Sequence, residues 1–421
     1  HDVQGLAHFL EHMLFLGTEK YPDAGSYQKF VSIHDGFSNA FTAEERTNYH
    51  FEIAPDHLDE ALDRFSEFFV SPLFNPELVQ REMKAIDSEH SKNLSSDFRR
   101  IFQVKREAYD PGHPALHFAT GNLQTLSGVT REVLLNFYQK HYSSNRMTLA
   151  VAGPQDLDTL QEWVAGRFNQ VKNRRLTALK LPETFLSQKE QFRLMHIKTV
   201  KDSRTLTLVF PLPTTQKYYR SRPLNMLGFL IGHEGRGSLL SLLKQEGLAS
   251  GLSAGGGDST SSYTSFEISI HLTQKGLKRY TSVIERVFQY LRLLREKSLP
   301  RDIFDEVRRM AEIDYRFAEK TGGTRLVNMF SLVMQIYPLR SVESSPFLIS
   351  DYRPRLFDSM LFRLIPENML ALLAARELKT DQTEKYYGTE YAYLEHRPNL
   401  IKKWKKAKTH PKLALPEPNP F

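Results

Sequence analysis

"GLAHFLEHMLFLGTEKYP", residues 5–22, is the stretch that decides how this sequence is interpreted. Its pattern predicts a short helix that stops at Gly17, a common position for glycine just beyond a helix. Most of the helical residues are Leu, Phe, Met or Ala, but His8, Glu11 and His12 are not. Two imidazoles and a carboxylate buried without partners would cost several kcal/mol, so their presence needs a chemical explanation.

Helical spacing offers that explanation. Positions i and i+4 share one face of a helix, so His8 and His12 are expected to project side by side. Two imidazoles so placed can bind one tetrahedral zinc ion at roughly 2.0–2.1 Å each. Glu11 borders the same face and can take a proton from a water that the metal activates, without being a ligand. The alternative, ordinary polar residues on an amphipathic helix, is weakened because this helix has no other polar face.

A second predicted helix, over residues 76–93, supplies a third ligand. Val79 and Ile86 are seven residues apart and define its inward stripe. Glu82 and Glu89 have the same spacing and fall on that stripe, although carboxylates are rarely buried unless paired. Glu89 is expected to be the third ligand, and Glu82 to orient a histidine or share a proton with it. The alternative that both carboxylates are simply solvated stays open.

The bulk composition narrows the other function classes. With 421 residues, two or three domains are expected. The absence of cysteine excludes disulfide scaffolds, thiol catalysis and cysteine-type zinc sites. The net charge of +7 permits an anionic partner, but the basic residues are scattered except in "KKWKKAK", 402–408, which is interpreted first as a solvated helix face. There is no apolar run long enough to span a membrane and no visible signal peptide.

The periodicity along the chain predicts an α+β protein. In the first part, helices are expected at 26–36, 58–69, 76–93 and 156–169, a β-hairpin at 36–54 and a buried strand at 146–153. In the second part, strands are expected at 204–213, 261–273 and 368–375, and helices at 225–247, 275–297 and 302–320. The glycine-rich "SAGGGDS", 253–259, is expected to be a hairpin turn rather than a phosphate-binding loop, because it lacks the lysine of such a loop.

The motif His8-x-x-Glu11-His12 is the inverted form of the H-E-x-x-H zinc signature. With Glu89 placed 77 positions after His12, the chain resembles the pitrilysin and insulinase family of inverzincin zinc peptidases. Further segments resemble that family in the same order: "HFLEHMLFLGTEKYP", "FSNAFTAEERTNYHFEI", "REMKAIDSEHSKN", "ATGNLQTLS", "HYSSNRMTLAVAG", "LIGHEGRGSLLSLLKQEG" and "EKYYGTEYA". Together these segments cover nearly the whole chain.

The resemblance implies a role for each matching residue. By position, the zinc ligands are His8, His12 and Glu89, and the general base is Glu11. The family's Asn-Ala pair on the strand that binds substrate backbone is matched by Asn39 and Ala40. The family's exosite, which anchors the N-terminal end of a substrate, is matched by residues in the stretch 233–239 near the glycines at 255–257. These exosite residues are His233, Glu234, Gly235, Gly237 and Ser238.

The resemblance also implies an architecture. Family members have four homologous α+β domains in two halves that close like a clamshell, and this chain resembles the first half. It is expected to hold two homologous domains, each an antiparallel sheet with helices packed on one face. The expected divisions are a zinc-binding domain at 1–187 that lacks its N-terminal strands, a non-catalytic domain with the exosite at 188–400, and a linker at 401–421.

The expected function is a zinc metalloendopeptidase, with one Zn²⁺ per chain, acting on oligopeptides and polypeptides of a few tens of residues. A homologous C-terminal half is expected to close the chamber and to hold the scissile carbonyl, so the chain alone should be weakly active or inactive. The alternative is a non-catalytic peptide-binding or assembly half that retains its zinc site. Nucleic-acid binding rests on net charge alone and is not expected, nor is a membrane span; homodimer formation stays open.

The remaining histidines are not expected to form a second metal site. His233-Glu234 begins an ordinary H-E-x-x-H, but position 237 is Gly237, so no second zinc site follows. His90, His113 and His117 are weaker candidates for auxiliary ligands and are expected to be surface or supporting residues instead. The protein is expected to be soluble, and both a periplasmic and a cytoplasmic location agree with the sequence.

Overall fold

The computed structural model describes residues 3–186, 192–319, 322–394 and 397–417. The chain forms two compact units, each assembled from three separate segments. Unit 1 comprises His1–Asn93, His117–Leu179 and Glu319–Glu343; unit 2 comprises Leu94–Leu116, Lys180–Ala318 and Ser344–Phe421. The predicted boundary at 187/188 lies outside the described residues. No helix in the described part of the chain is both long and apolar enough to cross a membrane.

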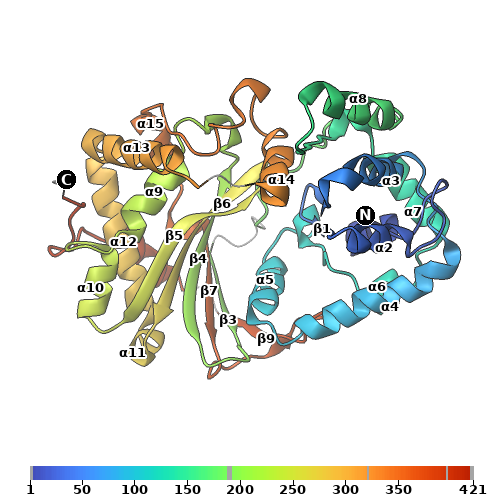
Figure 1. Cartoon of the computed structure of the whole chain (residues 1–421). Coiled ribbons are helices and arrows are strands. Elements are labelled where there is room, and N and C mark those ends of the chain that lie inside the picture. Colours follow the sequence, from blue (N-terminus) through green and yellow to red (C-terminus); the bar gives the residue numbers. More distant parts are fainter. Residues whose placement is uncertain (1–2, 187–191, 320–321, 395–396, 418–421) are drawn as a thin grey trace. The chain divides into compact units, whose positions relative to one another are not determined.

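Unit 1 consists of helices around one β-hairpin (Figure 1). The helices are α1 (Leu6–Leu14), α2 (Ser26–Ile33), α3 (Leu58–Val70), α4 (Pro76–Asn93), α6 (Leu123–Leu126), α7 (Arg131–His141), α8 (Leu157–Phe168) and α14 (Gly323–Val333). The hairpin pairs β1 (Phe37–Thr42) with β2 (Thr47–Glu52) in antiparallel register. The predicted helices of this part of the chain and the predicted hairpin are therefore confirmed.

Helix α1 is the centre of the unit 1 core. Its apolar residues are buried together with residues of α2, α3, α4 and α7. Gly5 precedes the helix with φ +86°, and a Cβ at this position would lie 2.3 Å from the Cα of Gly121. Only glycine allows both this left-handed backbone and this close approach. The contact fixes the start of α1 against the segment that also provides Thr120.

Helix α4 follows the predicted pattern. The Asn75 side chain accepts a hydrogen bond from the Glu77 backbone N–H, which satisfies a free donor of the first turn. Val79, Met83 and Ile86 are buried against the α1 core. The inward stripe predicted from the spacing is therefore present, and it carries its carboxylates toward α1.

The predicted strand at 146–153 is wrong. Residues 144–146 form a 3₁₀ turn, and 147–153 continue without regular structure and are not buried. A strand needs a neighbour for its backbone hydrogen bonds, and no described strand pairs with this segment. The Thr148 hydroxyl instead donates to the backbone carbonyl of Ser331.

Unit 2 is built on a seven-stranded sheet with the order β5-β6-β4-β7-β3-β9-β8. The strands are β3 (Phe192–Ile197), β4 (Arg204–Pro213), β5 (Ala249–Ser259), β6 (Tyr263–Leu272), β7 (Met369–Ala375), β8 (Gln382–Thr383) and β9 (Glu390–Tyr393). The α+β class is confirmed, and all neighbouring strands are antiparallel except β3 and β7. The predicted strand at 368–375 is β7, which is central and buried along its whole length.

Helices cover most of one face of this sheet (Figure 1). They are α9 (Pro223–Gly232), α10 (Leu239–Gln245), α11 (Gln274–Lys278), α12 (Tyr280–Lys297), α13 (Arg301–Arg316), α15 (Pro354–Leu361) and α16 (Pro398–Lys405). The opposite face is also partly covered, because Val104 of α5 (Asp97–Glu107) packs in one cluster with Val209 and Leu372. This second layer explains why β7 is apolar at every position rather than alternating.

The glycine-rich stretch at 253–259 corrects another prediction. It lies within strand β5, paired with β6 through a bulge, and is not a hairpin turn. Helix α9 packs on this strand, and a Cβ on Gly228 would lie 2.8 Å from the Ala254 carbonyl oxygen. Small residues on both elements therefore permit close helix–strand packing. The predicted helix at 225–247 is correspondingly divided into α9 and α10 by residues 233–238.

Residues 401–417 of the predicted linker pack onto unit 2. Trp404 stacks on Phe288 and is 2% exposed, whereas the lysines around it on α16 are solvated, as expected for "KKWKKAK". Leu413 is buried, and the Ala414 N–H donates to the Gly237 carbonyl at 2.9 Å. The segment around Ala414 is thus attached to the loop between α9 and α10.

Lys105 on α5 is a buried cation that joins α5 to the sheet. Its Nζ lies 2.7 Å from Asp258 and 3.4 Å from Glu267. Burial lowers the pKa of Lys105, but the two carboxylates outweigh this effect and the net shift is upward. Removing the ammonium would leave two partly buried carboxylates facing each other.

We expect Lys105→Met to lower the free energy of unfolding of unit 2 by about 2 kcal/mol, because it leaves its partners unpaired. Urea unfolding followed by tryptophan fluorescence measures this change. The parent and both variants all carry Trp163→Phe, so that Trp404, in unit 2, is the single tryptophan. Arg301→Ala, which breaks an exposed pair with Asp305, is the control and should leave the midpoint near that of the parent. An unchanged midpoint for Lys105→Met would contradict the prediction.

Candidate metal centre

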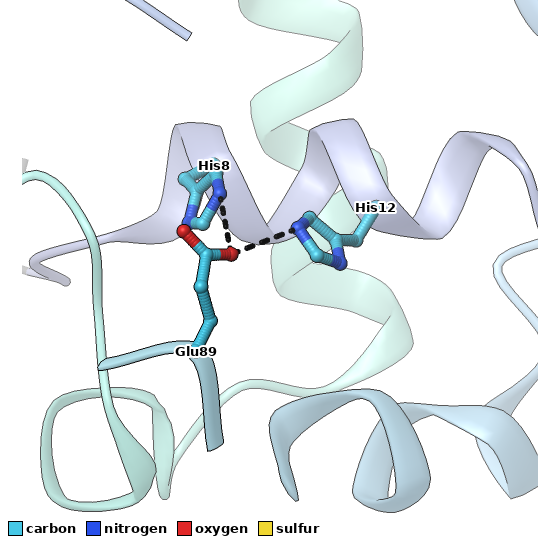
Figure 2. A group of neighbouring side chains, drawn as sticks. All are labelled: His8, His12 and Glu89. Carbon is cyan, nitrogen blue, oxygen red and sulfur yellow. Dashed lines mark ion pairs between the residues drawn. The ribbon is translucent and has the colours of Figure 1, made fainter. Parts of the chain in front are cut away.

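Three predicted ligands, His8, His12 and Glu89, come together between α1 and α4 (Figure 2). Glu89 Oε2 lies 3.6 Å from His8 Nε2 and 3.8 Å from His12 Nε2. The two imidazole rings are 4.8 Å apart and nearly perpendicular. Within the described residues, this is the one group of three or more His, Cys, Asp or Glu side chains that could hold a metal ion.

The donor set fits zinc. Two imidazole nitrogens and one carboxylate oxygen form a set used by catalytic zinc sites, which keep a fourth position open. Ligand atoms about 2.0–2.1 Å from a tetrahedral zinc are roughly 3.4 Å from each other. The nitrogen–oxygen distances here exceed that value by only a few tenths of an ångström. All three ligand atoms lie within 4.8 Å of one another, so the side chains would draw closer together to hold the ion.

Both histidines are oriented through their other ring nitrogen. His8 Nδ1 lies 2.7 Å from the Thr120 carbonyl, and His12 Nδ1 lies 2.8 Å from Glu82 Oε1. A carbonyl oxygen only accepts, so His8 Nδ1 carries the hydrogen and its Nε2 presents a lone pair to the site. Glu82 lies beside the histidine that it was expected to orient. Thr120 was not predicted, because a backbone carbonyl leaves no mark on the side-chain pattern.

The charges around His12 affect its proton affinity. Burial lowers the pKa of His12, but the hydrogen bond and charge of Glu82 and the charges of Glu11 and Glu89 outweigh it, so the net shift is upward. An imidazole must lose its proton before it binds a metal. Protons therefore compete with a metal at this position more effectively than at an ordinary histidine.

Glu11 has a different environment from the other carboxylates. It is 5% exposed and accepts a hydrogen bond from the Thr42 hydroxyl at the end of β1. Burial raises the pKa of Glu11; the Thr42 hydrogen bond and the His12 charge oppose this, Glu89 adds to it, and the net shift is upward. Glu11 is not part of the ligand group. A carboxylate with a raised pKa beside a metal-binding group suits proton transfer near neutral pH.

Asn39 and Ala40 lie on strand β1, whose partner is β2. The Ala40 N–H donates to the Asn39 side-chain oxygen at 2.9 Å. In the described part of the chain no further strand pairs with β1. Its outer edge therefore offers backbone groups to an added strand, as in peptide recognition by β-augmentation.

The predicted exosite residues lie in unit 2, in the loop between α9 and α10 and at the start of α10. Ser238 caps α10 by accepting from the Ser241 N–H. Gly237 has φ +82° and lies against Ala414, and Glu234 is 3.7 Å from Lys244. The loop has a defined local structure, but none of its residues belongs to the metal-site unit. Its assignment as an exosite stays a prediction.

The auxiliary histidines lie elsewhere. His90 and His113 are buried rather than on the surface, and their rings pack against Phe118 and Tyr263. The Nδ1 atom of His113 accepts from the Ala115 N–H, which is a structural role. Neither these two nor His117 belongs to the metal-binding group.

Comparison with known families decides the affiliation of the chain. Residues 1–112 match the model described as Insulinase (Peptidase family M16). Residues 128–311 match the Peptidase M16 inactive domain, and 315–421 match the middle or third domain of peptidase M16. The chain belongs to the insulinase family of peptidases. The resemblance seen in the sequence is thereby confirmed.

Relatives of this insulinase-family chain are longer than the chain. It is 39% identical over 429 residues to human insulin-degrading enzyme, spanning all of this chain and 42% of that protein. It is 37% identical over 429 residues to the A-factor-processing enzyme of Saccharomyces cerevisiae, with the same coverage. The crystal structure of pitrilysin matches the whole chain with a TM-score of 0.94 and 28% identity, over 45% of its own length. The chain thus spans less than half of each of these relatives.

We expect His8→Ala to reduce bound zinc from one ion per chain to nearly none, because two protein ligands hold zinc poorly. Metal analysis after dialysis against zinc-free buffer measures the stoichiometry. His271→Ala removes an exposed histidine of unit 2 and is the matched control, which should bind zinc like the parent. Full zinc retention by His8→Ala would remove His8 from the ligand set.

Glu82→Gln is expected to weaken zinc binding by roughly 10- to 100-fold, because it removes the carboxylate that orients His12 and adds to its basicity. Competition with a chromophoric chelator measures the zinc affinity. Glu162→Gln, on the exposed face of α8, is the control. An affinity equal to that of the parent would show that Glu82 does not support the site.

Proposed function

We propose that this chain carries the metal site of a zinc metalloendopeptidase that hydrolyses peptide bonds in oligopeptides and small polypeptides. His8, His12 and Glu89 hold one zinc ion, and Glu11 is the general base. The observation that carries the proposal is the convergence of two oriented imidazole nitrogens and one carboxylate oxygen beside a separate, buried carboxylate.

The zinc ion and the side chains around it supply different parts of the chemistry. Zinc, when bound, acts as a Lewis acid and lowers the pKa of a water molecule toward about 7. The histidines bind through Nε2, while Thr120 and Glu82 hold their rings in place. Glu11 takes the proton of the attacking water and returns it to the leaving amine. Its raised pKa favours both steps, since a very weak base could not accept the proton.

Substrate binding uses backbone contacts. In this proposal a peptide pairs with the outer edge of β1 at Asn39 and Ala40, and such pairing depends on backbone more than on side chains. The stretch 233–239 with Gly255–Gly257 anchors the N-terminal end of longer substrates. The names of two relatives refer to insulin and to A-factor, which agrees with polypeptide substrates for a peptidase of this family.

A second homologous half completes the enzyme in this proposal. The relatives are more than twice as long as this chain, which leaves room for such a half. It closes the chamber and holds the scissile carbonyl. The division of this chain into 1–187, 188–400 and a linker at 401–421 belongs to the same proposal.

We expect Glu11→Gln to lower peptide cleavage by roughly 100-fold or more while zinc binding is kept, because the amide cannot accept the proton. Mass spectrometry of digests of mixed 20- to 40-residue peptides, with and without chelator, measures cleavage in the full-length natural protein. Glu162→Gln is the matched control and should cleave like the parent. An active Glu11→Gln variant would remove Glu11 from the mechanism. A parent that binds zinc but cleaves no peptide would favour a non-catalytic, peptide-binding half.

A further inference from the structure

The position of the Glu11 carboxylate depends on the loop end of the β-hairpin, where β1 meets β2. The Thr42 hydroxyl hydrogen bonds to Glu11 Oε2. Thr42 is the last residue of β1 and pairs with Thr47, the first residue of β2. Their hydroxyl oxygens are 3.3 Å apart. Glu11 is thus held by a cross-strand pair and not by another residue of its own helix.

The contacts continue behind this pair. The Tyr142 phenol lies next to Thr47, and its oxygen is 2.6 Å from the Tyr49 phenol oxygen. The Tyr49 ring packs against Phe15 and Phe69 with centroid separations of 6.0 and 5.5 Å. Thr42, Thr47, Tyr142 and Tyr49 are called the hydroxyl chain below. It joins the hairpin to the residue that follows α7.

The direction of the Thr42 hydrogen bond follows from its acceptor, the Glu11 carboxylate. An ionised carboxylate only accepts, so Thr42 must donate to Glu11. The Thr42 oxygen can then accept from the Thr47 hydroxyl, 3.3 Å away. A hydroxyl that accepts one hydrogen bond donates the next more strongly. The Thr42 hydroxyl therefore donates to one oxygen of the Glu11 carboxylate.

Glu11 needs such a constraint because of where it lies. It sits next to His12 in sequence and feels the charges of both His12 and Glu89. A glutamate has flexible side-chain torsions, and a carboxylate so close to a metal group could itself become a ligand. That would occupy the open position of the ion and would remove the base. The Thr42 hydrogen bond turns one oxygen of Glu11 toward the hairpin instead.

We propose that the hydroxyl chain positions Glu11 as a base and keeps its carboxylate out of the metal coordination sphere. Thr42 is the positioning residue, and Thr47, with Tyr142 and Tyr49 behind it, supports its hydroxyl. The proposal rests on the proposed function for its effect on catalysis. Its effect on metal coordination can be measured without catalysis.

The decisive comparison is Thr42→Val against Thr42→Ser in the full-length natural protein. Valine keeps the shape and removes the hydroxyl, whereas serine keeps the hydroxyl. We expect Thr42→Val to lower kcat by about 10- to 100-fold, as small misplacements of reacting groups do. KM, zinc stoichiometry and melting temperature should remain near the parent values. Thr42→Ser should retain most of the kcat, which a purely structural role of the threonine methyl group would not allow.

Cobalt(II) substitution gives the measurement that is independent of activity. The visible absorption of Co²⁺ depends on its coordination number and geometry. We expect the spectrum of Thr42→Val to differ from the parent because Glu11 becomes a ligand, and that of Thr42→Ser to match the parent. Adding Glu11→Gln to Thr42→Val should restore a parent-like spectrum, since the amide is a poor ligand. Identical spectra for the parent and Thr42→Val would overturn the coordination part of the proposal.

Tyr142→Phe is the second variant, for the case that valine at position 42 lowers the melting temperature. It removes the third hydroxyl from Glu11, after those of Thr42 and Thr47, and keeps the ring. We expect kcat to fall by roughly threefold, since it loses one of the bonds that align Thr42. The proposed function stands if the parent cleaves peptides and Glu11→Gln does not. If Thr42→Val and Tyr142→Phe then both keep the parent kcat and spectrum, the positioning role of the hydroxyl chain is wrong. A parent without cleavage would reject the proposed function, and the cobalt spectra would still decide the proposal.

Discussion

The burial of α1 is the constraint on which the site depends. This helix is covered by the unit 1 core on most sides, so Glu11 is buried and the side chains of His8 and His12 are only 15% and 27% exposed. Each obtains a partner from a segment distant in sequence: His8 from Thr120, His12 from Glu82, and Glu11 from Thr42. Leaving such groups unpaired would cost more than most single contacts supply. The core and the metal centre are therefore one structure, because the same helix packing that buries the apolar residues also delivers the donors.

Much of this arrangement could be predicted from spacing. The i, i+4 histidines, the seven-residue spacing of Glu82 and Glu89, and the hairpin at 36–54 all depend on short-range periodicity, which the sequence displays directly. The Thr120 carbonyl and the Thr42 hydroxyl could not be predicted in the same way. A carbonyl is present at every residue, and threonine is common in strands. Only the tertiary packing decides which of them faces an imidazole or a carboxylate.

The errors in the fold prediction have a similar origin. Residues 146–153 have the composition of a strand, but a strand exists only where another strand accepts its hydrogen bonds. The glycines at 255–257 suggest a turn locally, yet they lie in β5 because α9 approaches that strand closely through Gly228. The parallel pairing of β3 with β7 joins residues far apart in the chain, and no local pattern encodes it. In each case a contact between distant segments overrides the local preference.

Two carboxylates of the site carry different chemistry because their surroundings differ. The Glu89 side chain is 38% exposed and lies beside both imidazoles, with which it forms the candidate ligand group. Glu11 is buried with its pKa raised, and its one close hydrogen-bond donor comes from the hairpin. Burial alone would favour the protonated acid, and the Thr42 hydrogen bond limits that effect by stabilising the charged form. In the proposed function, the hairpin whose edge binds a peptide therefore also contacts the base, and a peptide paired with β1 lies on the strand that ends at the Glu11 contact.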